Sequence, residues 1–252
     1  MKKSDVTVFD FSGIYEGEDF YLKIKNPRFI SCRDITGTNC ICDTYAQKEL
    51  QSRMDTAGCA ADGIHFIDSG NYHYMSELML RQIGEPVTLI LLDHHPDMQP
   101  SAFGNDILSC GSWVRNALDR QQNVAQVIAV GVDHRLADSI SPEYSDRVHF
   151  YDAEECRDVN GGISLPQEPL YPVYLSIDKD VLRTDEMITN WDQGTMKTDE
   201  VFDLVNYLLD HYLVLGTDIC GECAPDQETD DLQKAVDISN DWNERILSIL
   251  MK

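Results

Sequence analysis

The chain has 252 residues, with 20 lysines and arginines against 44 aspartates and glutamates, which gives a net charge of −24 at neutral pH. This acidic excess argues against the basic patch that binding to nucleic acid or to an anionic membrane requires, so neither is expected as a partner. Hydrophobic residues make up 42% of the chain, which is enough for a substantial core and excludes a charge-driven disordered protein.

Strands and helices alternate along the chain, as short apolar runs and segments of helical period. Strands are predicted at residues 5–11, 63–67, 87–92, 124–132, 148–151, 171–177 and 212–219. Helices are predicted at residues 44–54, 72–83, 112–120, 198–211 and 229–251. This alternation predicts a three-layer α/β/α sandwich with a mainly parallel central sheet. Because the sequence shows no linker and no internal repeat, residues 1–252 are interpreted as a single domain.

The sequence also indicates where the protein resides. No stretch approaches the ~18 consecutive apolar residues of a membrane span. The N-terminal segment has neither the apolar region nor the cleavage site of a secretory signal. The eight cysteines are too few for a dense disulfide framework in a chain of this length, so reduced thiols are expected. These features predict a cytoplasmic protein.

Two aspartate-rich motifs follow predicted strands, at the edge of the sheet where parallel α/β proteins bind ligands. Alternate residues of an extended chain share one face, so the first motif brings Asp93, His95 and Asp97 together. The second motif brings Asp178 and Asp180 together in the same way. Each aspartate could instead cap the turn after its strand, but the repeated spacing favours a shared binding site.

A third motif places His73 in a glycine-containing turn after the strand predicted at residues 63–67. The combined set of four carboxylates and two imidazoles, without a thiolate, is His73, Asp93, His95, Asp97, Asp178 and Asp180. Such an oxygen-rich donor set suits Mn²⁺ better than it suits structural zinc. Two divalent cations would also balance the four carboxylates. The sequence therefore favours Mn²⁺ at this site, with other divalent metals as alternatives.

The motifs at residues 93–97 and 176–180 resemble the Asp-x-His-x-Asp and Ser-x-Asp-x-Asp motifs of the ureohydrolase superfamily, which includes arginase, agmatinase and formiminoglutamase. The turn containing His73 is a looser match, and residues 216–222 resemble the family segment that carries a substrate-binding glutamate. The resemblance runs from about residue 60 to the C-terminus. It implies the three-layer fold, a binuclear manganese centre with the six ligands, and hydrolysis of a C–N bond of a guanidino or amidino compound by a metal-bridging hydroxide.

The resemblance also implies roles for single residues. Asp97 would aim the hydroxide, and Glu222 would pair with the cationic guanidinium or amidine of the substrate. Cys110 stands near the place of the histidine that shuttles protons in arginases, and it is either a small buried hydrophobe or a catalytic thiol. Asn105 and Trp191 are candidates for substrate binding, and Trp191 could instead pack as a core aromatic.

Departures from the family pattern around Cys110 and after Glu222 leave the substrate open, either a small guanidino compound or an arginine in a peptide. Two other hypotheses stay open. One is a deacetylase-like amidohydrolase with a single metal, and the other is a non-enzymatic relative that binds metal. The resemblance further suggests a homo-oligomer, without fixing the number of subunits.

Overall fold

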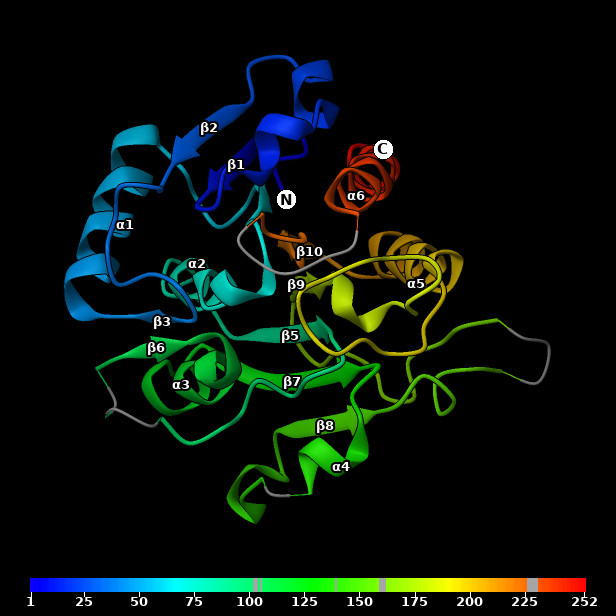
Figure 1. Cartoon of the computed structure of the whole chain (residues 1–252). Helices are drawn as coiled ribbons and strands as arrows, with labels where there is room; N and C mark the ends of the chain where they lie inside the picture. Colours follow the sequence, from blue (N-terminus) through cyan, green and yellow to red (C-terminus); the bar gives the residue numbers. More distant parts are fainter. Residues whose placement is uncertain (102–103, 105, 139, 159–161, 226–230) are drawn as a thin grey trace.

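The computed structural model describes residues 1–101, 104, 106–138, 140–158, 162–225 and 231–252, and Figure 1 shows its layers. The strands of the central sheet are β1 (Val6–Asp10), β2 (Arg28–Ser31), β4 (Ile64–Phe66), β5 (Val87–Leu92), β7 (Val124–Val130), β8 (Val148–Tyr151), β9 (Val173–Asp178) and β10 (Val214–Cys220). Their order is β2-β1-β4-β10-β9-β5-β7-β8, and each neighbouring pair runs parallel.

Helices cover both faces of this sheet (Figure 1). On one face lie α1 (Thr44–Ala57), α2 (Met75–Leu80) and α3 (Trp113–Arg120), and on the other lie α5 (Thr198–His211) and α6 (Leu232–Leu250). The central strand β5 is apolar throughout because it is buried on both faces. Leu89 and Leu91 pack into the core under α1–α3, and Ile90 and Leu92 pack into the core under α5 and α6. The predicted three-layer α/β/α fold is therefore confirmed.

Most predicted elements are present, with boundaries that differ by a few residues. The helix predicted at residues 72–83 is the main exception, because a 3-10 turn at Gly70–Tyr72 precedes the shorter α2. The sequence did not indicate α4 (His134–Ala137), β2, or a separate antiparallel pair formed by β3 (Ile41–Cys42) and β6 (Leu108–Ser109). None of the helices in the described ranges is both long and apolar enough to cross a lipid bilayer.

The sheet determines where the polar motifs meet. Strands β4, β10, β9 and β5 are consecutive neighbours, so their carboxyl ends lie at one edge. Asp93 directly follows β5, Asp178 is the last residue of β9, and Cys220 is the last residue of β10. Asp68 follows β4 by two residues and leads into the turn that carries His73. Four adjacent strands thus deliver polar side chains to one place.

Candidate metal centre

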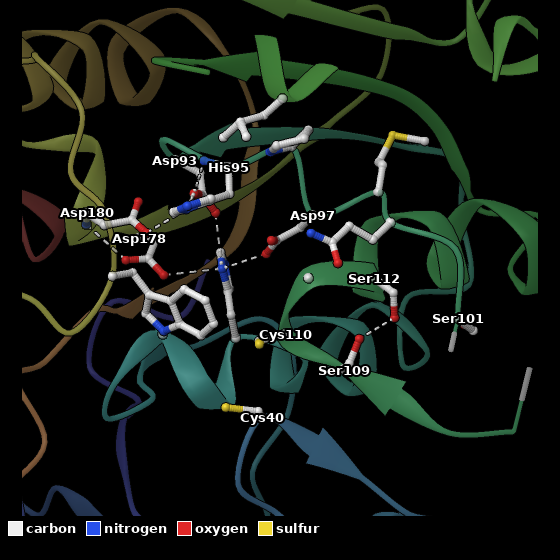
Figure 2. A pocket seen from close by; sticks show the side chains of 18 of the residues that line it. Cys40, Asp93, His95, Asp97, Ser101, Ser109, Cys110, Ser112, Asp178 and Asp180 are labelled. Atoms are coloured by element: carbon white, nitrogen blue, oxygen red, sulfur yellow. Dashed lines mark hydrogen bonds and ion pairs between the residues drawn. The ribbon is translucent and has the colours of Figure 1, made fainter. Parts of the chain in front are cut away.

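A pocket of about 440 Å³ lies at this edge of the sheet (Figure 2). All six residues that the sequence predicted as metal ligands line it: His73, Asp93, His95, Asp97, Asp178 and Asp180. Five of them are almost fully buried, and His95 is partly exposed. The sheet has therefore brought together side chains that are up to about a hundred residues apart in sequence.

One group of these side chains surrounds His73. Its Nδ1 atom lies 3.2 Å from Oδ2 of Asp93, 3.2 Å from Oδ2 of Asp97 and 3.5 Å from Oδ2 of Asp178. The ligand atoms of His73, Asp93 and Asp97 lie within 4.8 Å of one another, a spacing that a single metal ion can span. Figure 2 shows Asp93, Asp97 and Asp178 close together in the pocket.

A second group surrounds His95. Its Nδ1 atom lies 2.9 Å from Oδ2 of Asp180 and 3.6 Å from Oδ1 of Asp93. The ligand atoms of Asp93, His95 and Asp180 also lie within 4.8 Å of one another. Asp93 thus belongs to both groups, with Oδ2 directed to the first and Oδ1 to the second. A carboxylate shared in this way can bridge two cations.

The donor set fits divalent cations. Oδ2 of Asp93 is buried and accepts no hydrogen bond within the described part of the chain; it has only the ion pair with Nδ1 of His73 at 3.2 Å, although a buried carboxylate oxygen needs a hydrogen-bond donor. Burial raises the pKa of Asp178 to about 6, with a further rise from the charge of Asp180. Burial and the charge of Asp93 likewise raise the pKa of Asp180 to about 6. A cation at this place would satisfy the open oxygen and remove the repulsion between the carboxylates.

The aspartates of the pocket also change the pKa values of the two histidines. Burial lowers the pKa of His95, but its hydrogen bonds to Asp180 and Asp93 outweigh this and raise the value to about 11. His73 shows the same balance. Burial opposes its charge, but the hydrogen bonds to Asp93 and Asp97 outweigh this and raise its pKa well above the usual value. Both imidazoles are therefore protonated in the absence of a cation, and each would lose a proton on binding one.

A chain of hydrogen bonds orients His73 from behind. Its Nε2 atom lies 2.8 Å from the Ser176 hydroxyl, which donates to Oδ1 of Asp218 over 2.6 Å. Since Ser176 uses its only proton on Asp218, Nε2 of His73 must be the donor to Ser176. This assignment leaves Nδ1 to face the carboxylates. Asp218 was not predicted from the sequence, although its position inside a buried strand was a signal that it needs a partner.

Asp97 is fixed by Trp113, another residue that was not predicted from the sequence. The indole Nε1 of Trp113 donates to Oδ2 of Asp97 over 2.5 Å, and both side chains are buried. Asp97 also has a positive φ of 49°, a conformation that costs free energy in a residue other than glycine. The backbone N–H of Val114 helps to hold this conformation by donating to the carbonyl of Asp97 over 3.2 Å. The orientation of Asp97 is thus set by α3.

Asp68 builds the turn that carries His73. Its carboxylate accepts from the backbone N–H groups of Phe11, Ser12 and Ser69, at 2.9, 2.8 and 2.7 Å. Its own backbone carbonyl accepts from Gly221 and Glu222, at 3.0 and 3.1 Å. Asp68 does not line the pocket. Its role is to join the ends of β1, β4 and β10 beneath the site.

Cys220 adds a thiol that the sequence analysis did not place in the site. Its Sγ atom donates to Oδ2 of Asp178 over 3.1 Å, and its ligand atom lies within 4.8 Å of those of His73 and Asp178. Burial, the charge of Asp178 and its hydrogen bond raise the pKa of Cys220 well above the usual value. The residue therefore stays a neutral thiol, which orients Asp178 as a hydrogen-bond donor.

Glu222 lies outside the pocket, which differs from its expected role as the partner of a guanidinium. Its carboxylate is fully buried and pairs with Nζ of Lys179 over 2.5 Å. Ser239 donates to the other carboxylate oxygen, and Nδ2 of Asn243 donates over 2.8 Å. Burial opposes its charge, but Lys179 and these donors lower the pKa of Glu222. Its hydrogen-bonding capacity is directed to these groups, so we do not assign it to substrate binding.

The remaining candidates are placed as follows. Trp191 lines the pocket with 39% of its surface exposed. The rings of Trp191 and His95 are arranged edge to face, with their centroids 6.0 Å apart. Nε1 of Trp191 donates to Oδ1 of Asn71 over 2.9 Å. Cys110 is partly exposed and also lines the pocket. Asn105, a candidate for substrate binding, lies outside the described residues.

Several known proteins are similar to this chain. The Arginase family model matches residues 57–239. An uncharacterized protein of Thermotoga maritima is 27% identical over 227 residues, which cover 87% of this chain and 80% of that protein. The structure of proclavaminate amidino hydrolase from Streptomyces clavuligerus has a TM-score of 0.65 at 16% identity, covering 98% of this chain and 92% of that one.

A second solved structure is that of Trypanosoma cruzi formiminoglutamase with Mn²⁺. Its TM-score is 0.64 at 14% identity, and the match covers 97% of this chain and 93% of that one. At these identities the two structures show a shared fold. The family model itself covers most of the chain, including all six candidate ligands. The chain therefore belongs to the arginase family.

Proposed function

We propose that this protein is a hydrolase that cleaves a C–N bond of a guanidino or amidino compound at a centre of two Mn²⁺ ions. The ligands would be His73, Asp93, His95, Asp97, Asp178 and Asp180. The observation that carries the proposal is the position of Asp93, whose two oxygens face different groups of ligand atoms. Membership of the arginase family and the hydrolase names of the structural neighbours support the reaction class.

Two divalent ions supply Lewis acidity and acidify water, which makes hydrolysis possible at neutral pH. We assign to the chain the task of holding the reacting groups in place. Trp113 and the helix start at Val114 fix Asp97, whose carboxylate we assign to orient the attacking water and to accept its proton. Ser176 and Asp218 hold His73 in the orientation that presents Nδ1.

The pocket wall suggests how a planar cation is bound. Trp191 exposes its aromatic ring beside His95, and such a ring attracts a guanidinium or amidinium through cation–π interaction. Among the described lining residues, the four ligand aspartates are the only carboxylates, so we assign no separate carboxylate to the substrate cation. The pocket volume of about 440 Å³ suits a small molecule or the side chain of a peptide arginine.

Cys110 has no proton-transfer role in this proposal. Its hydrogen bond with Cys40 and its burial raise the pKa of the thiol far above the usual value. A group that holds its proton so firmly exchanges it poorly at neutral pH. We therefore expect a Cys110→Ser variant to keep the activity of the reduced wild type.

The test is a hydrolysis assay with metal-loaded protein. Mn²⁺-loaded and EDTA-treated samples are incubated with guanidino compounds, amidino compounds and arginine-containing peptides, and release of urea, ammonia or an amide is measured. We expect release only from the metal-loaded sample. The His95→Asn variant should lose the activity, and the neighbouring His94→Asn variant should keep it, since His94 does not line the pocket.

Two results would favour the other hypotheses. Full metal loading without turnover of any substrate would favour a non-enzymatic metal-binding protein. One equivalent of Zn²⁺ together with hydrolysis of an acylated amine would favour a deacetylase-like amidohydrolase. Either result would overturn the proposed reaction.

A further inference from the structure

Two cysteines differ from the rest of the thiols in this chain. All eight cysteines lie in the described residues, and six of them are buried. Cys40 and Cys110 are the two that are partly exposed, and both line the pocket. They come from segments about seventy residues apart, yet Figure 2 shows their sulfur atoms on the same side of the pocket, below the carboxylate cluster.

The small antiparallel pair of β3 and β6 brings these cysteines together. Ile41 lies opposite Ser109 and Cys42 lies opposite Leu108, so the next pair in this register is Cys40 and Cys110. The backbone N–H of Cys110 donates to the carbonyl of Cys40 over 3.0 Å, which shows that the register continues. Residues directly opposite in an antiparallel pair have Cα atoms ~4.5–5.5 Å apart, within the range of ~4.4–6.8 Å found for disulfides.

The side chains are also in contact. The thiols of Cys40 and Cys110 share a hydrogen bond, which is the main cause of the raised pKa of Cys110, ahead of burial and the nearby charge of Asp97. The hydrolysis proposed above uses neither of them, so their pairing asks for a different explanation.

We propose that Cys40 and Cys110 are a reversible dithiol–disulfide site in the wall of the pocket, oxidised by a hydroperoxide. This inference does not rest on the proposed hydrolase function, because the reaction involves the two thiols and the oxidant only. The strand register and the hydrogen bond from Cys110 to Cys40 bring the two cysteines next to each other. The chemistry can be followed without any substrate.

The reaction balances with hydrogen peroxide as the oxidant. One of the two cysteines attacks as its thiolate, breaks the O–O bond and becomes a sulfenic acid, with release of one water after proton uptake. The sulfur of the other cysteine then attacks the sulfenic sulfur. Its S–H proton leaves with the hydroxyl group as a second water. Two thiols are oxidised by two electrons, one peroxide is reduced, and a dithiol reductant reverses the bond by exchange.

The disulfide would add a covalent link to the short strand pair β3–β6 in the wall of the pocket. Strands β3 and β6 pair through only two residues each. Their pairing joins the segment at residues 32–42 to the segment that follows the ligand Asp97. A disulfide here closes a loop of about seventy residues, and closing a long loop stabilises a fold by restricting the unfolded chain. We expect the oxidised protein to unfold several degrees higher than the reduced protein.

The test maps the bond in the full-length protein. Reduced protein is treated with hydrogen peroxide, free thiols are alkylated, and the sample is digested with trypsin without reduction. Cleavage after Arg33 and Lys48 gives peptide 34–48, which carries Cys40 and Cys42. Cleavage after Arg81 and Arg115 gives peptide 82–115, which carries Cys110. We expect these peptides to be linked in most molecules, with loss of two hydrogen atoms, and to separate after dithiothreitol.

Variants identify the partner within peptide 34–48. Cys40→Ser and Cys110→Ser should abolish the link and the rise in unfolding temperature, and Cys42→Ser should keep both. Thermal unfolding of each reduced variant shows whether it is folded. Alkylation of both cysteines in peroxide-treated wild type would overturn the proposal. A link that survives in folded Cys40→Ser, or a bond between Cys40 and Cys42, would overturn it as well.

Discussion

The indole of Trp113 donates a hydrogen bond to Oδ2 of Asp97 over 2.5 Å, and this contact ties the start of α3 to the candidate metal centre. Asp97 sits in a left-handed backbone conformation, which a neighbouring helix must stabilise. The carboxylate therefore has one defined orientation before any metal binds. The contact gives a direct prediction.

Replacing Trp113 with phenylalanine should weaken metal binding and activity together. The variant keeps an aromatic side chain in the core but loses the donor to Asp97, and losing a residue that orients a ligand costs roughly 10–100-fold in metal affinity or activity. Titration calorimetry with Mn²⁺ measures the change. The control is Trp242→Phe, since Trp242 is also buried but lies on α6, in the core on the other face of the sheet, and does not line the pocket. Equal effects in both variants would show that the role of Trp113 is packing alone.

The support behind His73 can be tested in the same way. Asp218→Asn allows the Ser176 hydroxyl to change partner, and Ser176→Ala removes the acceptor for Nε2 of His73. Each variant should lower Mn²⁺ affinity by roughly tenfold or more. Because the residues form one chain of hydrogen bonds, the double variant should lose little beyond the larger single effect. Additive losses would mean that Ser176 and Asp218 act separately.

Gly70 has room for no side chain. A Cβ atom at this position would lie 2.9 Å from Oδ2 of Asp178 and 3.0 Å from Cδ1 of Trp191. Gly70→Ala should therefore displace either the ligand or the ring and reduce hydrolytic activity at least tenfold, with a shift in tryptophan fluorescence. Gly84→Ala is the matched control, because a Cβ atom there meets nothing within 4 Å. Full activity of Gly70→Ala would contradict the close packing around Asp178.

The buried ion pair of Lys179 and Glu222 should affect stability more than chemistry. Lys179→Met leaves the Glu222 charge unpaired in the core, which typically costs about 3–5 kcal/mol. Urea unfolding of the metal-free protein measures the free energy of unfolding. Adding Glu222→Gln removes the stranded charge and should recover much of the loss. A double variant as unstable as Lys179→Met would show that packing, rather than charge, is responsible.

Metal binding should release protons and weaken at low pH. In the metal-free protein the pKa of His95 is about 11, and those of Asp178 and Asp180 are about 6. Each group binds metal in its deprotonated form, so protons compete with the cation. Apparent Mn²⁺ affinity should rise with pH and fall most steeply below pH 6, where the carboxylates also hold protons. Calorimetry in buffers of different ionisation enthalpy counts the protons, and binding without release would contradict this assignment.

The fold was largely predictable because its strands are buried on both faces. The continuously apolar run at Val87–Leu92 identified the central strand, and the alternation of Asp93, His95 and Asp97 identified residues that the structure brings into one pocket. Both signals are local and depend only on the strand period. The second motif departs from the strand period, because Lys179–Val181 form a 3-10 turn, yet Asp178 and Asp180 both line the pocket and Lys179 pairs with Glu222 outside it.

The contacts that depend on distant pairing were not predictable. Glu222 matches a family motif in sequence, but Lys179, Ser239 and Asn243 surround it only after α6 packs on the sheet. Likewise, the pairing of Cys40 with Cys110 rests on two residues in each of two short strands, which leave no periodic pattern. A single sequence contains no local signal for such pairs.

We propose above that one pocket binds two metal ions and that Asp93 would contact both. The most direct measurement is Mn²⁺ stoichiometry by elemental analysis, combined with electron paramagnetic resonance of the loaded protein. The account predicts two Mn²⁺ per chain with the spectrum of an exchange-coupled pair, and loss of that coupling in Asp93→Asn. One Mn²⁺ per chain, or two ions with uncoupled spectra in the wild type, would contradict it.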